Sequence, residues 1–499
     1  MTKSSDAGVA RVMSASLRGL DAVAVRVEVD LAPDLPAFSL VGLPSTGVRE
    51  ARERIGAALR HAGFRWPNGR VTVNLAPTEE RKEGAALDLA IATGILLASG
   101  QLRHPGGDWM RETLFAAELA LDGVIRAPRG LVALAMDAAA LGLRRMVVPR
   151  SQAGMLRSLT GVETLGLPHL RQLAALLGRR GSTAAAELFD QPSAASDSIL
   201  RQLRGQERAL RAISVAAAGG HHVSLLGPPG CGKTLLARAL WSLLPVLDDE
   251  AWRARLRIES CCGLPFDPVA ARRPPFRAPH HSVSTGGLVG GGRPLAAGEI
   301  TLAHGGVLFL DEFTEFAQRQ LDMLREPMET GSIRLARQGQ SLSFPSAFQL
   351  VAAANPCPCG YANSRVRNCV CTPGSKRRYL NRLSGPLRDR LELWVELDRV
   401  PAQVLLGSQP SVDVLQLRRS VEAAVARGAR RREDAVSLSA ATERYLVAAA
   451  DKLQLSARAV HSVLRVARTI ALLEGSEAPA PEHLAEACAY RPPPMGIGD

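Results

Sequence analysis

The segment GPPGCGKT, residues 227–234, has the residue types and spacing of a loop that binds phosphate groups. Its glycines let the backbone curl so that N–H groups face an anion, and a following helix N-terminus adds partial positive charge. Lys233 would reach the β- and γ-phosphates of a nucleotide, and the Thr234 hydroxyl would bind Mg²⁺. The apolar run VSLL before the loop and the helix-like run after it give the required strand–loop–helix setting. The segment therefore predicts an ATP-binding site formed by Gly227, Pro228, Pro229, Gly230, Cys231, Gly232, Lys233 and Thr234.

Two later apolar runs also end in polar residues suited to ATP hydrolysis. GGVLFLDEF, 305–313, reads as a buried strand followed by Asp311 and Glu312. Asp311 suits the Mg²⁺ partner of the phosphate loop, and Glu312 would polarise a water for attack on the γ-phosphate. FQLVAAANP, 348–356, ends in Asn355, which would hold that water at the carboxyl end of the sheet. Each run alone is typical of an ordinary strand end, but behind a phosphate loop the two together predict a hydrolytic site.

Four cysteines fall within NPCPCGYANSRVRNCVC, residues 355–371: Cys357, Cys359, Cys369 and Cys371. Two C-x-C pairs are separated by nine residues, and four thiolates can enclose Zn²⁺ tetrahedrally. The usual zinc ribbon has two residues between paired ligands, so small core thiols and a redox device stay open as alternatives to zinc. The remaining cysteines, Cys231, Cys261, Cys262 and Cys488, fit small buried residues.

The composition predicts a cytoplasmic globular protein of three domains. The chain has 499 residues, of which 46% are hydrophobic and 22% charged, and a domain takes roughly 150 residues. The first residues have no continuous apolar core, so they are a poor secretory signal. The longest mostly apolar run has about fourteen residues and contains Asp88, and it is shorter than the ~20 residues of a membrane-spanning helix. Thiols stay reduced in the cytoplasm, which argues against disulfides. A net charge of +13 favours polyanionic partners, and only 4% aromatic residues favour phosphate contacts over base stacking.

The chain divides into segments of different periodicity. Residues 1–180 contain two alternating runs, VAVRVEVDLAP and RVTVNLAP, with an amphipathic helical pattern between them, and predict a mixed α/β domain. Residues 181–198 are rich in small residues and predict a linker. Residues 199–407 predict a second α/β domain, with the nucleotide motifs and a cysteine insert at 357–371, and residues 408–499 predict a helical domain.

The three strands in this order resemble the core of AAA+ ATPases, with Walker A at 227–234, Walker B at 307–312 and sensor 1 at Asn355. Further segments narrow the resemblance to the Mg-chelatase-like subgroup: FRAPHHSVSTGGLVGGG, LREPMETG, NPCPCGY and LSGPLRDRLELWVEL. Over nearly the full length the chain is similar to the ComM/YifB family, bacterial ATPases tied to DNA processing in natural transformation. The resemblance implies a P-loop AAA+ core with a helical lid domain, ATP and Mg²⁺ as ligands, and a homo-hexameric ring with nucleotide between subunits.

The resemblance also implies arginines that act on the phosphates. A ring of this kind needs an arginine from the neighbouring subunit, and SGPLRDRLEL carries Arg390 as first candidate and Arg388 as second. Such a cation stabilises charge on the transferring phosphoryl group, typically by ~10³–10⁵ in rate. Arg458 in LSARAV matches the family's sensor 2, reaching from the lid to the γ-phosphate. The alternatives are a surface pair with Asp389 for Arg390 and a solvated helix face for Arg458.

The first domain resembles the proteolytic domain of Lon-type proteases, a ribosomal S5-like α/β fold. RKEGAALDLA, 81–90, aligns with the stretch in which those proteases carry their nucleophilic serine, and Ala86 takes that place. A methyl group cannot attack a carbonyl, and the chemistry needs the hydroxyl. The resemblance therefore implies a non-proteolytic domain with a structural or nucleic-acid-binding role.

Two segments are candidates for contact with DNA in the pore of such a ring. METGSIRLARQGQSLSFPSAFQ, 328–349, reads as a β-hairpin in which Arg334 and Arg337 would touch phosphates, with exposed strand charges as the alternative. The glycine-rich loop after His280 and His281 is a pore or interface candidate rather than a metal site.

The ATPase motifs and the basic charge, together with the resemblance to the ComM/YifB family, imply a hexameric ATPase that couples hydrolysis to branch migration or unwinding of single-stranded or branched DNA. One alternative is a magnesium-chelatase-like metal-insertion motor subunit, which shares the motifs of residues 199–407. The other is a Lon-like ATP-dependent protease, which needs an active serine where this chain has Ala86.

Overall fold

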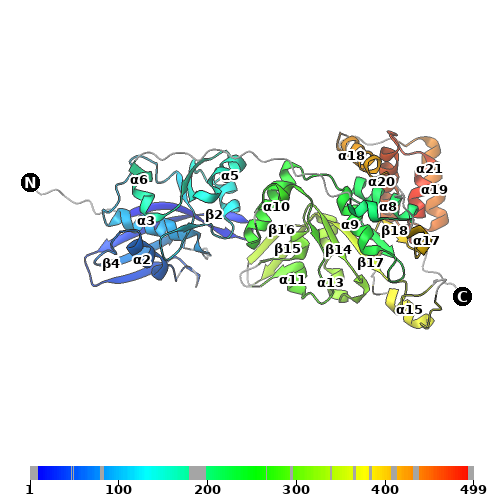
Figure 1. The fold of residues 1–499 in the computed structure, drawn as a ribbon, viewed down its shortest axis with the longest axis horizontal. Coiled ribbons are helices and arrows are strands. Elements are labelled where there is room, and N and C mark those ends of the chain that lie inside the picture. Colours follow the sequence, from blue (N-terminus) through cyan, green and yellow to red (C-terminus); the bar gives the residue numbers. More distant parts are fainter. Residues whose placement is uncertain are drawn as a thin grey trace, which may run out of the picture. The chain divides into compact units, whose positions relative to one another are not determined.

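The computed structural model describes residues 9–45, 48, 50–78, 82, 84–178, 198–265, 267–292, 296–337, 340–362, 367–380, 382, 385–405, 413–430 and 438–492. The chain forms two compact units, one of residues 1–190 with 253–269 and one of residues 191–252 with 270–499. Each unit has its own sheet and its own apolar core (Figure 1). None of the described helices is long and apolar enough to cross a membrane.

The first unit is built on a seven-stranded sheet. Its strands are β1 (Ala10–Arg18), β2 (Asp21–Ala32), β3 (Ala37–Val41), β4 (Arg70–Ala76), β5 (Thr113–Phe115), β8 (Arg145–Pro149) and β9 (Glu163–Leu167). They lie in the order β3-β4-β2-β1-β5-β8-β9, with β1–β2 and β2–β4 antiparallel and the other pairs parallel. The predicted alternation is confirmed, because Val25, Val27 and Val29 of β2 are buried while Arg26 and Asp30 are exposed.

Helices complete the first unit. They are α2 (Ala51–His61), η1 (Ala85–Leu87), α3 (Asp88–Ala98), α4 (Leu131–Asp137), α5 (Arg150–Thr160), η2 (Leu170–Gln172) and α6 (Leu173–Gly178), with a small ribbon of β6 (Glu118–Leu119) and β7 (Ile125–Arg126). The long apolar run is the core helix α3, and a Cβ on its Gly94 would lie 2.6 Å from Val29 Cγ2. The helix therefore packs closely on β2. Its buried Asp88 is paired with Arg54 of α2 at 2.9 Å.

Residues 253–269 belong to the first unit although they follow the nucleotide motif in the chain. Most of this segment is the later part of α10 (Asp249–Cys262). Arg257 Nη2 lies 2.5 Å from Asp137 Oδ1, Arg253 Nη1 donates to the Leu159 carbonyl, and the Gly130 amide donates to the Ser260 carbonyl. These bonds fix the segment on α4 and α5.

The second unit is built on a five-stranded parallel sheet. Its strands are β10 (Val223–Leu226), β11 (Phe276–Arg277), β14 (Val307–Leu310), β17 (Gln349–Ala354) and β18 (Leu393–Glu396), in the order β11-β14-β17-β10-β18. All residues of β14 and β17 are buried, as the continuous apolar runs VLFL and QLVAAA predict for strands covered on both faces. The carboxyl ends of the central strands β14, β17 and β10 lie together at one edge, which brings the predicted polar residues to the same place.

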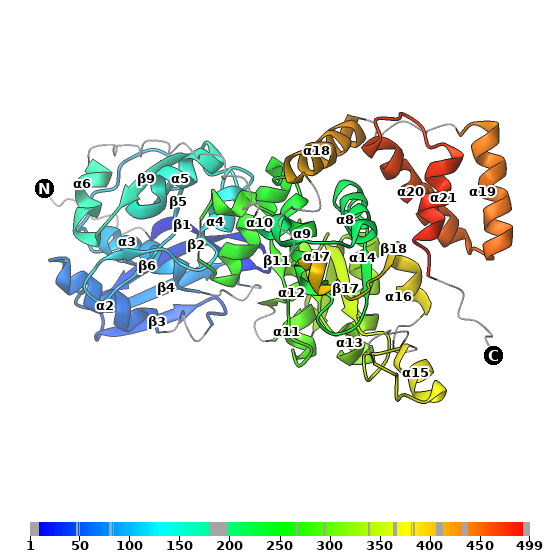
Figure 2. The same ribbon diagram turned by 45° about the vertical axis from the view of Figure 1, so that its right-hand side comes forward.

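Short elements surround this sheet. They are α7 (Ser198–Gln202), α8 (Glu207–Gly219), α9 (Lys233–Leu243), η3 (Ala270–Arg272), α11 (Thr285–Val289), α12 (Glu299–Leu302), η4 (Phe313–Glu315), α13 (Gln318–Asp322), α14 (Arg325–Thr330), α15 (Pro373–Leu380), α16 (Gly385–Arg390) and α17 (Ala402–Leu405). Two hairpins are separate from the sheet: β12 (Gly290–Gly291) with β13 (Ala296–Ala297), and β15 (Ser332–Arg337) with β16 (Gln340–Pro345). Both views show α15 projecting from the body of this unit (Figure 1; Figure 2).

The chain ends in helices α18 (Val414–Arg430), α19 (Ala440–Leu453), α20 (Ala457–Leu473) and α21 (Pro481–Ala489). We call them the C-terminal helices (Figure 2). Val463, Val466 and Ile470 of α20 are buried in the same core as Ile213 of α8 and Val223 of β10. Because they share one core with the sheet, the C-terminal helices and the parallel sheet belong to one unit.

Candidate nucleotide-binding site

The phosphate-loop motif lies between the end of β10 and the start of α9, so the predicted strand–loop–helix setting is confirmed. Gly230 and Gly232 have φ angles of 76° and 95°, a left-handed backbone that favours glycine. A Cβ on Gly227 would lie 2.8 Å from the Leu397 carbonyl oxygen and 2.7 Å from Cys231 Sγ. The glycines thus allow a tight turn that ends in the free N–H groups of a helix N-terminus, which attracts phosphate.

The Lys233 ammonium joins the phosphate loop to the end of β17. Its Nζ donates to the Gly227 carbonyl at 2.7 Å, to the Pro228 carbonyl at 3.1 Å and to Asn355 Oδ1 at 3.0 Å. Burial lowers the pKa of Lys233, and the nearby carboxylates of Asp311 and Glu312 oppose that shift. The structure therefore brings together Lys233 and Asn355, which lie 122 positions apart in the chain.

Oxygen ligands suited to Mg²⁺ meet beside this lysine. Thr234 Oγ1 donates to Asp311 Oδ2 at 3.3 Å, and the Glu312 amide donates to Asp311 Oδ1 at 3.0 Å. Hydroxyl and carboxylate oxygens are the ligands that Mg²⁺ prefers, so this donor pair fits the ion. Glu312 has φ 49° and ψ 43°, a left-handed backbone that costs about 1–3 kcal/mol for a residue with a side chain and is typical of functional sites.

Two residues beside the site were not predicted to belong to it. His281 Nδ1 lies 3.7 Å from Glu312 Oε2, and its ring is 4.0 Å from that of His280, centroid to centroid. Gln206 has a left-handed φ of 61°, and its side-chain amide donates to the carbonyls of Cys231 and Asp398. The histidine pair could be recognised as a motif in the sequence, but the motif did not predict that His281 lies beside Glu312.

The two predicted arginines, Arg390 and Arg458, form ion pairs with the same carboxylate. Arg390 of α16 and Arg458 of α20 both pair with Glu329 Oε1 of α14, Arg458 at 2.7 Å. Arg390 also donates to the Pro386 carbonyl. Among the described residues, no hydrogen bond or ion pair joins either arginine to the phosphate loop of the same chain. Arg388, the second candidate, lies over the ring of Trp394 at 5.5 Å.

The four cysteines of residues 357–371 form one cluster. Their sulfur atoms all lie within 4.8 Å of one another. Cys357 Sγ is 3.4 Å from Cys359 Sγ and 3.6 Å from Cys369 Sγ, and the latter two are also 3.6 Å apart. The four thiols lie together, as a zinc site would require, and they follow Asn355 closely in the chain.

Comparisons with known proteins find similarity over nearly the whole chain. Family models match in three places: magnesium chelatase subunit ChlI at 199–405, subunit ChlI of Mg-chelatase at 27–152, and the ChlI C-terminal model at 412–491. Competence protein ComM of Haemophilus influenzae is 38% identical over 97% of both chains, and YifB of Escherichia coli is 37% identical over 95% of both. The chain belongs to the ComM/YifB family of Mg-chelatase-like proteins. A magnesium-chelatase 67 kDa subunit of Heliobacterium mobile is 30% identical, over 32% of this chain and 28% of that one.

The AAA+ membership of this family implies ATP and Mg²⁺ as ligands, and the strand ends of this ComM/YifB member fit both.

The predicted hairpin of the family is present as β15 and β16, in which Arg334 pairs in register with Ser343 and is exposed. Arg337 pairs in register with Gln340, and its side chain lies outside the described residues. A Cβ on Gly290 of β12 would lie 2.8 Å from Leu335 Cδ1, so the glycine-rich loop packs against this hairpin.

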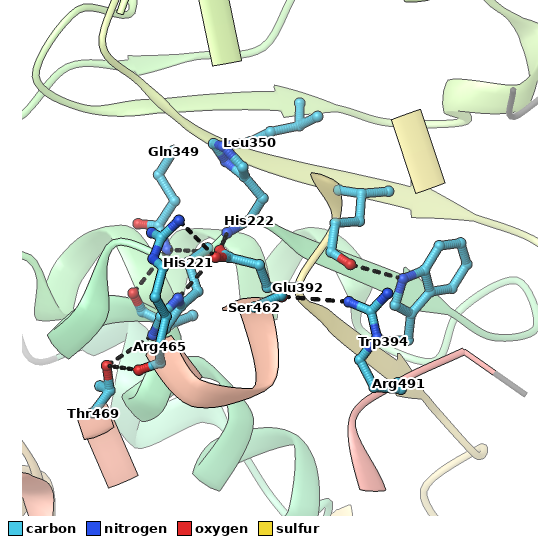
Figure 3. A network of polar contacts seen from close by, with 12 residues as sticks. His221, His222, Gln349, Leu350, Glu392, Trp394, Ser462, Arg465, Thr469 and Arg491 are labelled. Carbon is cyan, nitrogen blue, oxygen red and sulfur yellow. Dashed lines mark hydrogen bonds and ion pairs between the residues drawn. The ribbon is translucent and has the colours of Figure 1, made fainter. Parts of the chain in front are cut away.

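A buried polar network lies at the opposite ends of the same strands (Figure 3). Glu392, just before β18, accepts from His221 Nδ1 and from the His222 amide, both at 3.1 Å, and pairs with Arg465 of α20 at 3.0 Å. His221 Nε2 is bonded to Thr469 Oγ1 at 2.8 Å, also on α20. The network therefore fastens the helix that carries Arg458 to the strands that carry the nucleotide motifs.

The ionisation of this network follows from its burial and pairing. Burial lowers the pKa of His222 to about 4, so its ring is neutral and its Nδ1 accepts from the Leu350 amide of β17. Burial opposes ionisation of Glu392, but the charges of His221 and Arg465 and the bond from His221 outweigh it and lower the pKa of Glu392 to about 2. Glu392 is therefore a buried carboxylate at neutral pH.

In the first unit, Ala86 lies in η1 with only 4% of its surface exposed. The position that the Lon resemblance assigns to a nucleophile is thus apolar and buried in this ComM/YifB member.

Proposed function

We propose that this chain is a Mg²⁺-dependent ATPase that works as a hexameric ring and couples ATP hydrolysis to branch migration or unwinding of DNA. The observation that carries the proposal is the meeting of Lys233 with Asn355 and of Thr234 with Asp311 at one edge of a parallel sheet. These are the groups that phosphoryl transfer needs for holding phosphates, metal and attacking water.

Each residue has a separate task in this proposal. The loop amides and Lys233 bind the phosphates, and Thr234 Oγ1 and Asp311 hold Mg²⁺, which when bound neutralises charge that develops on the phosphoryl oxygens. Glu312 accepts a proton from the attacking water, and Asn355 Oδ1 orients that water. His281, 3.7 Å from Glu312, positions the carboxylate.

The site is completed by a neighbouring copy. Arg390 is bound to Glu329 within its own chain and has no bond to its own phosphate loop among the described residues, which suits a residue that serves the adjacent subunit. Arg458 is held by the same carboxylate, and its side chain would turn from Glu329 toward the γ-phosphate as sensor 2. Glu329 would then hold both cations until nucleotide draws them away.

DNA as the substrate is supported by charge and by the relatives. The net charge is +13, and the hairpin β15–β16 carries exposed Arg334 next to the glycine-rich loop. A relative of nearly the same length carries the name competence protein ComM. Arg334 and Arg337 would contact phosphates in the ring's pore, and the protein would act in the cytoplasm on incoming DNA during transformation.

The test replaces the lysine of the phosphate loop. Lys233→Ala should abolish ATP turnover and, with it, strand exchange on branched DNA, because the phosphates lose their cation. Lys452→Ala, an exposed lysine of α19, is the matched control and should retain both activities. Undiminished strand exchange by the Lys233 variant in the presence of ATP would refute the motor.

A second function has one observation in its favour. The match to the magnesium-chelatase 67 kDa subunit covers about a third of this chain, which supports a metal-insertion motor. ATP hydrolysis stimulated by branched DNA would favour the first function, whereas ATP-dependent metal insertion into a porphyrin with a partner subunit would favour the second.

A further inference from the structure

The sulfur cluster has the geometry of a single tetrahedral metal site. Zinc bonded to sulfur at about 2.3 Å places neighbouring thiolates about 3.8 Å apart at the corners of a tetrahedron. The three separations among Cys357, Cys359 and Cys369 are 3.4, 3.6 and 3.6 Å, and Cys371 Sγ lies within 4.8 Å of each. The four sulfurs therefore already lie near the corners that one ion would occupy.

Neither a disulfide nor a set of core thiols fits the cluster as well as a metal does. A disulfide needs sulfurs about 2.0 Å apart, and all four cysteines are free thiols. Thiols that merely fill a core should be buried, yet only Cys357 is buried and the other three are partly exposed. Two backbone amides also point at sulfur: the Cys359 amide donates to Cys371 and the Ala362 amide to Cys357. Amide donors of this kind stabilise metal-bound thiolates.

The cluster touches the nucleotide site at two points. Asn355 accepts a hydrogen bond from Lys233, and only Pro356 separates it from Cys357, the first cysteine of the cluster. Gly360 lies between the first two cysteines and the rest, and a Cβ built on it would lie 2.8 Å from Pro229 Cδ and 3.8 Å from Asn355 Cγ. The backbone of the cysteine loop thus rests on the phosphate loop.

We propose that Cys357, Cys359, Cys369 and Cys371 bind one Zn²⁺, and that this ion holds Asn355 and Pro229 in the position that nucleotide requires. The second half of the proposal rests on the ATPase function. The ion closes the loop of residues 355–371, and the described residues of this loop contain no helix or strand. The ion would therefore be the main support that holds Gly360 against Pro229. A misplacement of about 1 Å in a phosphoryl-transfer site can cost roughly 10²-fold in rate.

The experiment measures metal and nucleotide affinity on the full-length chain. Elemental analysis should find about one zinc per chain in the wild-type protein, as for a Cys₄ structural site. Cys369→Ser and Cys371→Ser should lose the zinc and bind a fluorescent ATP analogue with Mg²⁺ about 10-fold more weakly or worse, as expected when one hydrogen bond to a charged group is lost. Cys262→Ser, outside the cluster, is the matched control. Circular dichroism checks that each variant is folded.

A second variant separates the metal from its effect on the site. Gly360→Ala keeps all four sulfurs but drives a methyl group into Pro229 at a backbone φ of 82°. It should retain zinc and still bind the ATP analogue more weakly, whereas Gly374→Ala, with open space around its Cβ position, should change neither.

Each failure has a distinct signature. Wild-type protein with no zinc, or with iron and its visible absorbance, would overturn the metal assignment. Folded, zinc-free variants that bind the analogue as tightly as the wild type would overturn the coupling. Wild-type protein that carries zinc but binds no nucleotide would refute the ATPase function and the coupling with it, and would leave the zinc assignment intact.

Discussion

The Glu392 carboxylate should be one of the main attachments of α20 to the parallel sheet, and Glu392→Gln tests this. The pairing with His221 and Arg465 lowers the pKa of Glu392 from 4.5 to about 2. At about 1.4 kcal/mol per pKa unit, this shift corresponds to roughly 3 kcal/mol of stabilisation of the folded state at neutral pH. Removing one partner of a buried ion pair costs about 3–5 kcal/mol in other proteins, and because the Arg465 side chain is 61% exposed we expect the lower end of that range here.

The sign of the pH dependence follows from the direction of the shift. Because the folded pKa is below the unfolded one, the stabilisation is fully present above about pH 4.5 and is lost as the pH falls toward 2. A chain with two units does not unfold in one step, so local opening is the better measurement. Hydrogen exchange with mass spectrometry should show amides of α20 and of the start of β10 exchanging roughly 100-fold faster in the variant.

The control lies at the far end of the strand that follows Glu392. Glu396 at the other end of β18 is exposed, and Glu396→Gln should leave exchange unchanged. Protection of α20 that changes by less than about threefold in Glu392→Gln would contradict the reasoning, because an ion pair worth so little would resemble an exposed one.

Two further predictions concern the nucleotide site. Arg390→Ala should lower ATP turnover by about 10³-fold or more, and mixing it with Lys233→Ala should restore part of the rate, because each subunit lends what the other lacks; a mixture no faster than its components would argue against a shared site. Gly227→Ala should weaken nucleotide binding, because the added methyl would meet the Leu397 carbonyl at 2.8 Å, whereas Gly374→Ala should not; equal affinities in a binding titration would contradict the tight-turn geometry.

Much of the nucleotide site could be predicted because its residues sit at strand ends. A run such as VLFL followed by Asp311 specifies both a buried parallel strand and the edge at which its polar end lies. Once the phosphate loop had fixed that edge, Thr234, Asp311 and Asn355 had to come near one another. The mixed α/β units and the helical C-terminal region followed from periodicity in the same way.

Contacts between distant loops could not be predicted. Glu329 lies 61 positions from Arg390 and 129 from Arg458, and nothing in LREPMETG shows that its second glutamate holds two cations. The contact of Gly360 with Pro229 depends on the path of a loop, and His281 lies near Glu312, a residue 31 positions later in the chain. Periodicity shows which face of an element is buried and leaves open which element covers it.

The packing of residues 253–269 on α4 and α5 has a consequence for any attempt to divide the protein. The polypeptide passes from one unit to the other at 190/191, again at 252/253 and back at 269/270. A single cleavage in the segment before residue 198 would therefore leave the two units joined, because residues 253–269 follow the phosphate loop in the chain but belong to the first unit. A fragment of residues 191–499 expressed alone would carry buried residues of 253–269, such as Leu256 and Ile258, without the rest of the first unit, and we expect it to aggregate.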